Sequence, residues 1–180
     1  MPSSFQYRFA NMIIAETDRL IIRHFNENDA EYVLKQLNET SFIHFIADKG
    51  VRNIADAIKY LNDGPISSYQ KFGYGLNIVT LRCSGEAIGM CGLVDREELK
   101  YPDLGFAFLP MYWRKGYAKE ACEVVLDDAR GALNLDVVLG ITLPDNHSSN
   151  TLLTKLGFIP KGTTSLYGTE NNLYEKRLKI

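Results

Sequence analysis

MYWRKGYAKEA, residues 111–121, is the stretch of this sequence that decides the fold. An apolar run over residues 104–109 precedes it, and a long helical pattern follows it. The order therefore predicts a strand, a short basic loop with a glycine, and a helix N-terminus. The first amides of a helix have no intrahelical acceptor, and the helix dipole places partial positive charge there. Phosphate groups bind at such ends, so the sequence predicts an anion site.

The charges of this loop favour a bound anion. Acidic residues stabilise the first turn of a helix, yet Arg114, Lys115 and Lys119 stand at the start of this one. Gly116 has no Cβ, so the backbone can approach a ligand closely. A solvated basic turn, with the glycine needed only for its geometry, is the alternative that this segment leaves open.

The composition is that of an ordinary globular protein. The chain has 180 residues, of which 46% are hydrophobic and 23% charged, and this suits one domain with a substantial core. The net charge of −2 provides no basic field for nucleic acid. No apolar run is long enough for a membrane span, and the first residues do not resemble a signal peptide.

Cysteine and histidine usage argues against disulfides and metal sites. The three cysteines, Cys83, Cys91 and Cys122, include no CxxC pair, so we expect a cytoplasmic protein in a reducing environment. Cys91 is expected to be a buried structural residue rather than a nucleophile. The three histidines show no metal-ligand spacing, and no metal is expected.

The rest of the chain alternates between helical and strand patterns. Helices are expected where apolar residues recur every three or four positions, at residues 30–37, 54–61, 118–133 and 148–156. Asn53 should cap the second of these helices, and Gly157 should follow the end of the last. Strands are expected in apolar or alternating runs, at residues 20–25, 73–81, 87–94, 103–109, 137–143, from 158 onward and at 173–180.

The connections between these elements carry further predictions. Residues 1–15 are expected to form an N-terminal arm, and residues 16–180 a single domain. Gly64-Pro65 should end the second helix. Residues 42–45 are expected to be an aromatic loop, and residues 163–172 a polar loop.

Two blocks together resemble the GNAT superfamily of acetyl-CoA-dependent N-acetyltransferases. The loop pattern of that family is Arg or Gln, two residues, Gly, one residue, then Gly or Ala. Gly116 and Ala118 fill its last two positions, and Trp113 departs from the first. That departure is typical of the RimJ/RimL-type ribosomal-protein N-terminal acetyltransferases. The second block is similar to the family's Asn-x-x-Ser followed by Lys-Leu-Gly-Phe, which Asn146, Ser149 and residues 155–158 match in order.

This resemblance implies a fold and a co-substrate. The expected fold is an α/β (α+β) GNAT fold with a mixed, mostly antiparallel central sheet of about seven strands, flanked by about four helices and splayed at strands 4 and 5. Acetyl-CoA is the expected donor. Its expected contacts are the loop residues Arg114, Lys115, Gly116, Tyr117, Ala118 and Lys119, the strand edge at Phe106, Ala107 and Phe108, and the side chain of Asn146.

The resemblance also implies catalytic roles. Ser149 is placed near the expected sulfur and could protonate the departing thiolate, whereas a helix N-cap is its alternative role. Asn146 is a further catalytic candidate because it can orient the pantetheine, and an Asx-turn is its alternative. Asp103 stands where this branch usually has Glu, and it could take the proton of the amine. His44 is a second candidate base. A solvated carboxylate and a packing histidine are the plain alternatives for these two residues.

We therefore expect an acetyl-CoA-dependent N-acetyltransferase that acts on a primary amine by direct attack. A protein N-terminus of the ribosomal type is the first choice of acceptor. A small amine, such as an amino acid, polyamine or antibiotic, is the alternative, and a non-catalytic CoA-binding sensor is another. The acceptor should depend on residues 42–53 and 163–172, where Asp48 and Glu170 are the acids that stand out. Nucleic acid and membrane partners are not expected, and a monomer and a homodimer both remain open.

Overall fold

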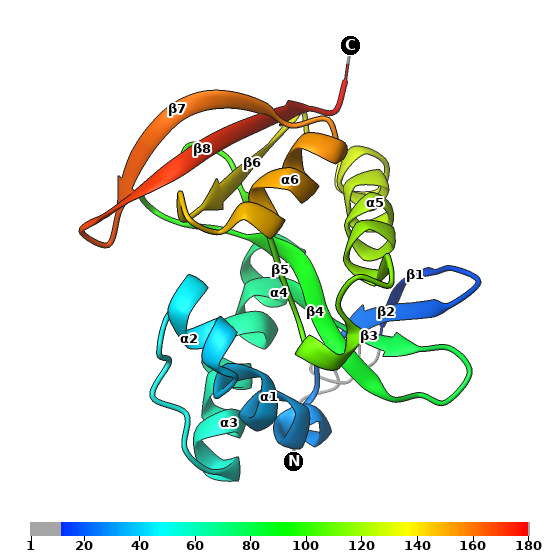
Figure 1. The fold of residues 1–180 in the computed structure, drawn as a ribbon. Coiled ribbons are helices and arrows are strands. Elements are labelled where there is room, and N and C mark those ends of the chain that lie inside the picture. The colour runs from blue at the N-terminus through cyan, green and yellow to red at the C-terminus, as the bar shows by residue number, and fades with distance from the viewer. Residues whose placement is uncertain (1–11, 180) are drawn as a thin grey trace.

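The computed structural model describes residues 12–179, which form one eight-stranded sheet with helices on both faces (Figure 1). The strand order is β1-β2-β3-β4-β5-β6-β8-β7. Only β5 and β6 pair in parallel, and the other neighbours are antiparallel. The strands are β1 (Ile13–Glu16), β2 (Leu20–His24), β3 (Leu76–Leu81), β4 (Ala87–Val94), β5 (Asp103–Phe108), β6 (Val137–Thr142), β7 (Ile159–Leu166) and β8 (Thr169–Arg177).

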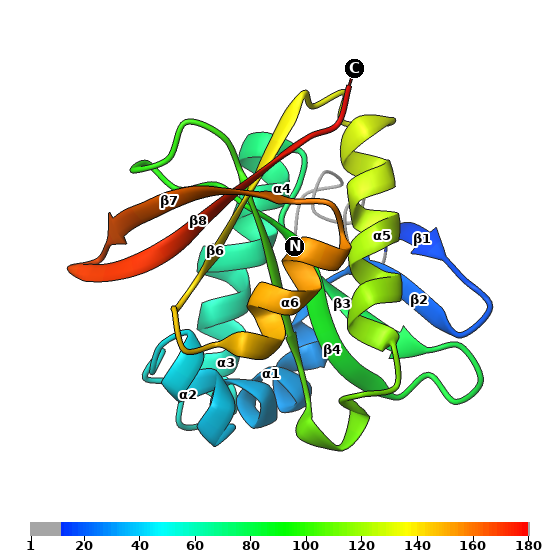
Figure 2. The same cartoon turned by 45° about the horizontal axis from the view of Figure 1, so that its top comes forward.

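The helices form two groups. Helices α1 to α4 lie on one side of the sheet, and α5 and α6 lie on the other (Figures 1 and 2). The helices are α1 (Ala30–Leu37), α2 (Thr40–Phe45), α3 (Ile54–Leu61), α4 (Ser67–Phe72), α5 (Tyr117–Arg130) and α6 (His147–Lys155). Short helical turns are η2 (Glu27–Asp29), the π-helical η3 (Asn62–Ile66) and η4 (Pro110–Tyr112).

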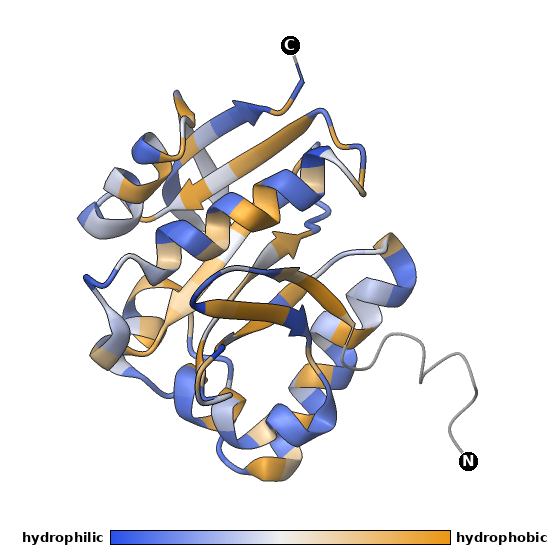
Figure 3. Ribbon diagram, turned by 90° about the vertical axis from the view of Figure 1, so that its right-hand side faces the viewer, coloured by the Kyte–Doolittle hydropathy of each residue, from blue (hydrophilic) through white to orange (hydrophobic). Residues whose placement is uncertain are grey.

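The long helix α5 is held to the sheet by its apolar face. Ala121, Cys122 and Val125 are buried, and apolar and polar segments alternate along the helix in Figure 3. This is the spacing of three and four that the sequence predicted. Burial of that face fixes the direction of α5, and therefore also the position of its N-terminus next to β5.

The strands β5 and β6 diverge from a single point of contact. Only Asp103 and Leu139 are in register, and the Leu139 amide donates to the Pro102 carbonyl oxygen at 2.9 Å. Beyond this point β5 stays paired with β4, and β6 stays paired with β8. The predicted splay is therefore present, and it lies between the fifth and sixth strands because β1 adds a strand that was not predicted.

That additional strand comes from the predicted arm. Ile13–Glu16 pairs antiparallel with β2, so residues 13–15 of the predicted arm pair with the sheet. Cross-strand pairing supplies the hydrogen bonds that a four-residue segment cannot make alone. Residues 1–11 of the predicted arm lie outside the described residues.

Two predictions about helices are wrong. Residues 42–45 belong to the short helix α2 and are not a loop. Gly64-Pro65 does not end the second helix, because the chain passes through the π-helical turn η3 and continues as α4 to Phe72. Proline removes a helical hydrogen bond and crowds the preceding turn, and a wider π turn accommodates such an interruption.

The predicted polar loop at residues 163–172 is a hairpin. Ser165 pairs with Glu170, and Leu166 pairs with Thr169, across a turn formed by Tyr167 and Gly168. Most of β7 is exposed because it is the edge strand of the sheet. Polar residues therefore suit this strand, and their composition concealed it from sequence analysis.

Candidate active site

The basic loop adopts a backbone shape that suits an anion. Arg114 has φ 59° and Gly116 has φ 83°, so two left-handed residues flank Lys115. Turns of this kind bring successive N–H groups into a concavity that binds anions. Gly116 is the N-cap of α5 and provides no side-chain acceptor. The Glu120 amide is bonded to the Gly116 carbonyl oxygen at 3.1 Å, and the amides before it have no intrahelical acceptor.

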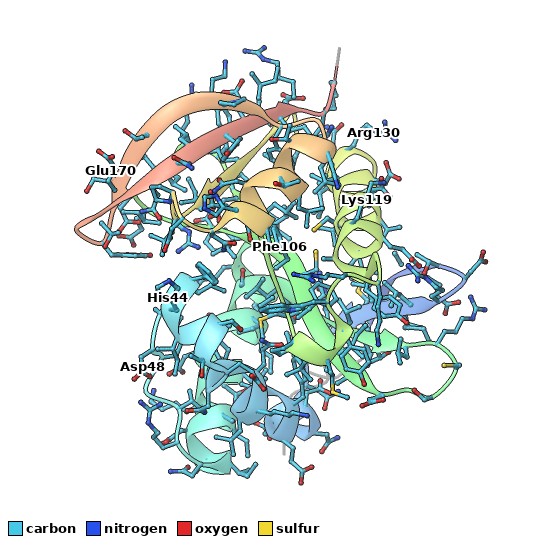
Figure 4. All side chains as sticks on the ribbon, in the orientation of Figure 1. His44, Asp48, Phe106, Lys119, Arg130 and Glu170 are labelled. Carbon is cyan, nitrogen blue, oxygen red and sulfur yellow. The ribbon has the colours of Figure 1, made fainter. Side chains whose placement is uncertain are left out.

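The predicted anion-site residues differ in accessibility. Arg114, Lys115 and Gly116 are exposed, and Tyr117 and Ala118 are half-buried where the helix begins. Lys119 is exposed and donates to Glu123 Oε1 at 2.5 Å. Residues 114–116 are therefore open to solvent, and Figure 4 shows Lys119 on α5, the helix that follows them.

The strand β5 precedes this loop in the chain and has a free edge where it separates from β6. The Leu109 amide donates to the Ile88 carbonyl oxygen on the β4 side. Because backbone groups alternate in direction along a strand, those of Phe106 and Phe108 point toward the diverging β6. Those of Ala107 point toward β4, so only two of the three predicted edge residues offer their backbone there. The Phe108 carbonyl oxygen accepts a bond from Trp113 Nε1 at 2.7 Å.

The start of α6 places Asn146 and Ser149 together. Asn146 Oδ1 accepts a bond from the Ser149 amide at 3.2 Å, so Asn146 is the N-cap of α6. The helix begins at His147, and the alternative role of Ser149 as N-cap is therefore wrong. Within residues 12–179, neither the Ser149 hydroxyl nor Asn146 Nδ2 has a hydrogen-bond partner, so both are free to meet a ligand.

Asn150 holds this region in place, and the sequence analysis missed it. Its Oδ1 accepts bonds from Thr142 at 2.5 Å, Tyr174 at 2.8 Å and Asn172 at 3.1 Å. Its Nδ2 donates to the carbonyl oxygen of Asn146 at 2.9 Å. These bonds join the end of β6, the cap of α6 and β8. Asn150 directly follows Ser149 in the matched motif, but only the fold shows its partners.

Asp103 lies at the closed end of the splay and is almost fully buried. Arg96 Nε donates to its Oδ1 at 2.7 Å, and Nη1 of the same arginine lies 3.4 Å from the Tyr167 hydroxyl. Burial raises the pKa of the Asp103 carboxyl, and Arg96 opposes that rise. The predicted base is thus not a solvated carboxylate, and it forms an ion pair with Arg96.

His44 is brought to the same region from the other side of the molecule. Its Nε2 lies 3.2 Å from Asp145 Oδ2, so α2 meets the connection between β6 and α6 (Figure 4). The ring also packs edge-on against Phe45, at 4.6 Å between centroids. Both side chains of the His44–Asp145 pair are about 60% exposed. Asp145 is the immediate neighbour of Asn146, so the second candidate base lies next to the predicted catalytic segment.

The remaining predictions concern groups without a chemical role. Cys91 is fully buried, with its Sγ 3.7 Å from that of Cys122. Burial raises the pKa of the Cys122 thiol, which suits a structural pair. Across residues 12–179 no cluster of His, Cys, Asp and Glu could hold a metal ion. In the same part of the chain, no helix is both long and apolar enough to cross a membrane.

Comparison with known proteins identifies the family of this chain. Residues 19–159 match the family described as an acetyltransferase (GNAT) domain. The uncharacterized N-acetyltransferase YoaA of Bacillus subtilis (strain 168) is 28% identical over 159 residues, which cover 88% of this chain and 89% of YoaA.

Two solved structures show the same fold. RimL, a ribosomal L7/L12 alpha-N-protein acetyltransferase in complex with coenzyme A, has a TM-score of 0.77 at 16% identity, covering 92% of this chain and 97% of RimL. The microcin C7 self-immunity acetyltransferase MccE, in complex with acetyl-CoA and AMP, has a TM-score of 0.76 at 18% identity, covering 89% and 93%. The predicted GNAT fold is confirmed, with eight strands where about seven were expected. The chain belongs to the GNAT family of acetyl-CoA-dependent N-acetyltransferases.

Proposed function

We propose that this protein transfers the acetyl group of acetyl-CoA directly to a primary amine while both substrates are bound. One observation carries the proposal: the unpaired edge of β5 is followed, after the short turn η4, by a left-handed loop at the N-terminus of α5. The edge can pair with the amides of a pantetheine arm, and the loop can bind a pyrophosphate. A nucleotide without pantetheine would use only the loop.

The residues that would hold acetyl-CoA follow from this geometry. The loop residues 114–119 would bind the pyrophosphate through their amides and through the nearby cations. The Phe106 backbone N–H and carbonyl, together with Asn146 Nδ2, would hold the pantetheine. Ala107 would contribute the strand itself, since its backbone groups point toward β4. When bound, acetyl-CoA supplies an activated acetyl thioester that an amine can attack.

Proton transfer is assigned to two groups of the chain. The Ser149 hydroxyl would donate a proton to the sulfur of the departing thiolate, since Asn146 rather than Ser149 caps the helix. The Asp103 carboxylate would take the proton of the amine, directly or through water. His44 is the alternative base, because Asp145 Oδ2 lies 3.2 Å from its Nε2 and can orient its ring.

The acceptor is proposed to be a protein N-terminus of the ribosomal type, with a small amine as the alternative. RimL, which shares the fold, is an alpha-N-protein acetyltransferase of ribosomal L7/L12. The connection between α2 and α3 and the hairpin of β7 and β8 would form the acceptor side, and Figure 4 shows Asp48 and Glu170 on these two elements. Asp48 is bonded to Arg52 at 2.6 Å, so it is not a free acid for a cationic peptide.

The base assignment predicts a pH dependence. A general base must be deprotonated, so kcat/KM should fall as the pH drops through the pKa of Asp103. Since burial raises that pKa, the fall should occur above the value of about 3.9 for a free aspartate. Asp103→Asn should abolish this acidic limb together with most of the rate. The pH profile of kcat/KM, measured with an acceptor that a thiol-release screen identifies, checks this result.

Two further variants make this measurement decisive. Glu98→Gln changes an exposed acid in the same connection that does not contribute to the pKa shift of Asp103, and it should keep the wild-type profile. If the acidic limb persists in Asp103→Asn and disappears in His44→Gln, the base is His44 and the assignment to Asp103 is wrong. Circular dichroism is needed for the Asp103 variant, because Arg96 then lacks its counter-ion.

The proposed function is tested first by thermal melting. A ligand that binds only the folded state, at about 100 times its dissociation constant, adds about 2.7 kcal/mol. For a domain of this size the midpoint should rise by about 5 to 10 °C with acetyl-CoA. ATP has phosphates and adenine but no pantetheine, and it should give little shift. An equal shift with both ligands, or none with acetyl-CoA, would contradict the proposal.

A screen for thiol release then separates the acceptor classes. The test compares peptides with a free N-terminus, the same peptides blocked by an Nα-acetyl group, and small amines such as spermidine and free amino acids. Turnover of the free but not the blocked peptide supports the ribosomal type of acceptor. Turnover of small amines alone favours the alternative. Binding of acetyl-CoA without turnover of any amine would indicate a non-catalytic sensor.

A further inference from the structure

Arg19 comes from the connection between the first two strands of the sheet, and its side chain contacts the candidate phosphate-binding loop. Arg19 Nη1 donates to the Lys115 carbonyl oxygen at 3.0 Å. Its Nε donates to Glu120 Oε2 at 2.8 Å, and Nη2 contacts the same oxygen at 2.5 Å. The guanidinium carbon also lies 4.5 Å from the centre of the Tyr117 ring. One side chain therefore contacts the loop, the first turn of α5 and the ring at its first position.

The hydrogen bond from Arg19 to the Lys115 carbonyl oxygen sets the direction of the Gly116 amide. In a trans peptide the carbonyl oxygen and the following N–H point in opposite directions. Since Arg19 holds the Lys115 carbonyl oxygen, the Gly116 N–H must point away from Arg19. Gly116 itself tolerates several backbone conformations, so it would not keep this direction alone. Arg19 supplies the constraint that a glycine loop lacks.

The hydrogen bonds from Arg19 to Glu120 compensate the negative charge of the Glu120 carboxylate. A carboxylate in the first turn of α5 suits the helix dipole, but it would repel a phosphate bound at the same end. Glu120 is bonded by Arg19 and by the Thr17 hydroxyl, the latter at 2.5 Å. Burial acts to raise the pKa of Glu120, but these hydrogen bonds and the charge of Arg19 outweigh burial and lower it. The carboxylate is thus ionised and directed toward Arg19.

We infer that Arg19 is a positioning residue for the binding of the pyrophosphate of acetyl-CoA. It orients the Gly116 amide through Lys115, and it offsets the charge of Glu120. This inference rests on the proposed function, because the loop must bind a pyrophosphate for the orientation to matter. It extends the site to a segment that precedes every matched motif.

The test is the dissociation constant of acetyl-CoA, measured by calorimetry. Arg19→Ala should weaken binding about tenfold, because it removes hydrogen bonds that involve charged groups. Arg19→Lys should recover part of the affinity, since it keeps the charge but loses the planar fork. The matched control is Arg82→Ala. Arg82 donates to the Thr17 carbonyl oxygen at 3.0 Å in the same turn, and no contact joins it to the loop in the part of the chain described.

A second ligand separates positioning from a general effect on the fold. S-acetylpantetheine ends before the pyrophosphate, so Arg19→Ala should leave its affinity unchanged in ligand-observed NMR. If wild type binds acetyl-CoA but Arg19→Ala and Arg82→Ala bind it equally well, the inference is overturned. Equal weakening of both ligands by Arg19→Ala would also overturn it, because Arg19 would then only support the fold. If wild type itself does not bind acetyl-CoA, the proposed function fails instead.

Discussion

Replacing Gly116 with valine should raise the dissociation constant for acetyl-CoA at least about 100-fold, equivalent to about 2.7 kcal/mol. Gly116 has φ 83°, a conformation that is strained for a β-branched residue. The loop would have to leave this conformation, and its amides would no longer converge on one point. A Cβ at this position would also lie 3.3 Å from Arg19 Nη2. Calorimetry with acetyl-CoA measures the effect.

The matched control for this variant is Gly85→Val. Gly85 has φ 74° in the turn between β3 and β4, and a Cβ there would meet nothing within 4 Å. Both variants therefore introduce a similar backbone strain at an exposed glycine. Only the Gly116 variant should lose affinity for acetyl-CoA. Equal affinities in the two variants would contradict the assignment of the pyrophosphate to the N-terminus of α5.

Replacing Ser149 with alanine should lower kcat about 100-fold, the size of effect that a lost general acid produces. The affinity for acetyl-CoA should change by less than about twofold, because the lost interaction would be made mainly in the transition state. Asn146 caps α6 through the Ser149 amide, not through its hydroxyl, so the alanine variant keeps the cap. Steady-state kinetics and calorimetry on the same preparation separate the two quantities.

The neighbouring serine is the control for Ser149. Ser148 is exposed on the same helical turn, and Ser148→Ala should retain the wild-type rate. An unchanged kcat in Ser149→Ala would contradict the assignment of the acid. Equal losses in both variants would indicate that the first turn of α6 is sensitive to any substitution, and that neither hydroxyl donates the proton.

Much of the secondary structure was predictable because its signals are local. The apolar spacing in residues 118–133 predicts the helix whose regular part is α5, since each turn repeats the same contact with the sheet. Asn53 was predicted to cap α3, and it accepts the Asp56 amide at 2.9 Å. Gly157 was predicted to follow α6, and its φ of 83° fits that position.

The strands that the sequence analysis did not predict have a different physical origin. The hairpin of β7 and β8 and the strand β1 exist because partners elsewhere in the sheet complete their hydrogen bonds. Composition does not report such partners, and polar edge strands look like loops. In both cases a contact that is distant in the sequence overrides the local signal.

The sequence by itself determined the order of strand, basic loop and helix, the glycine where the loop must be left-handed, and the two motifs that indicate the family. These are properties of neighbouring residues. The tertiary structure alone decided that β5 and β6 separate beyond Asp103, that Asn150 joins β6 to β8, and that Arg19 reaches Lys115. Hydrogen bonds of this kind join segments that lie far apart in the chain. Their partners become defined only when the packed sheet brings those segments together.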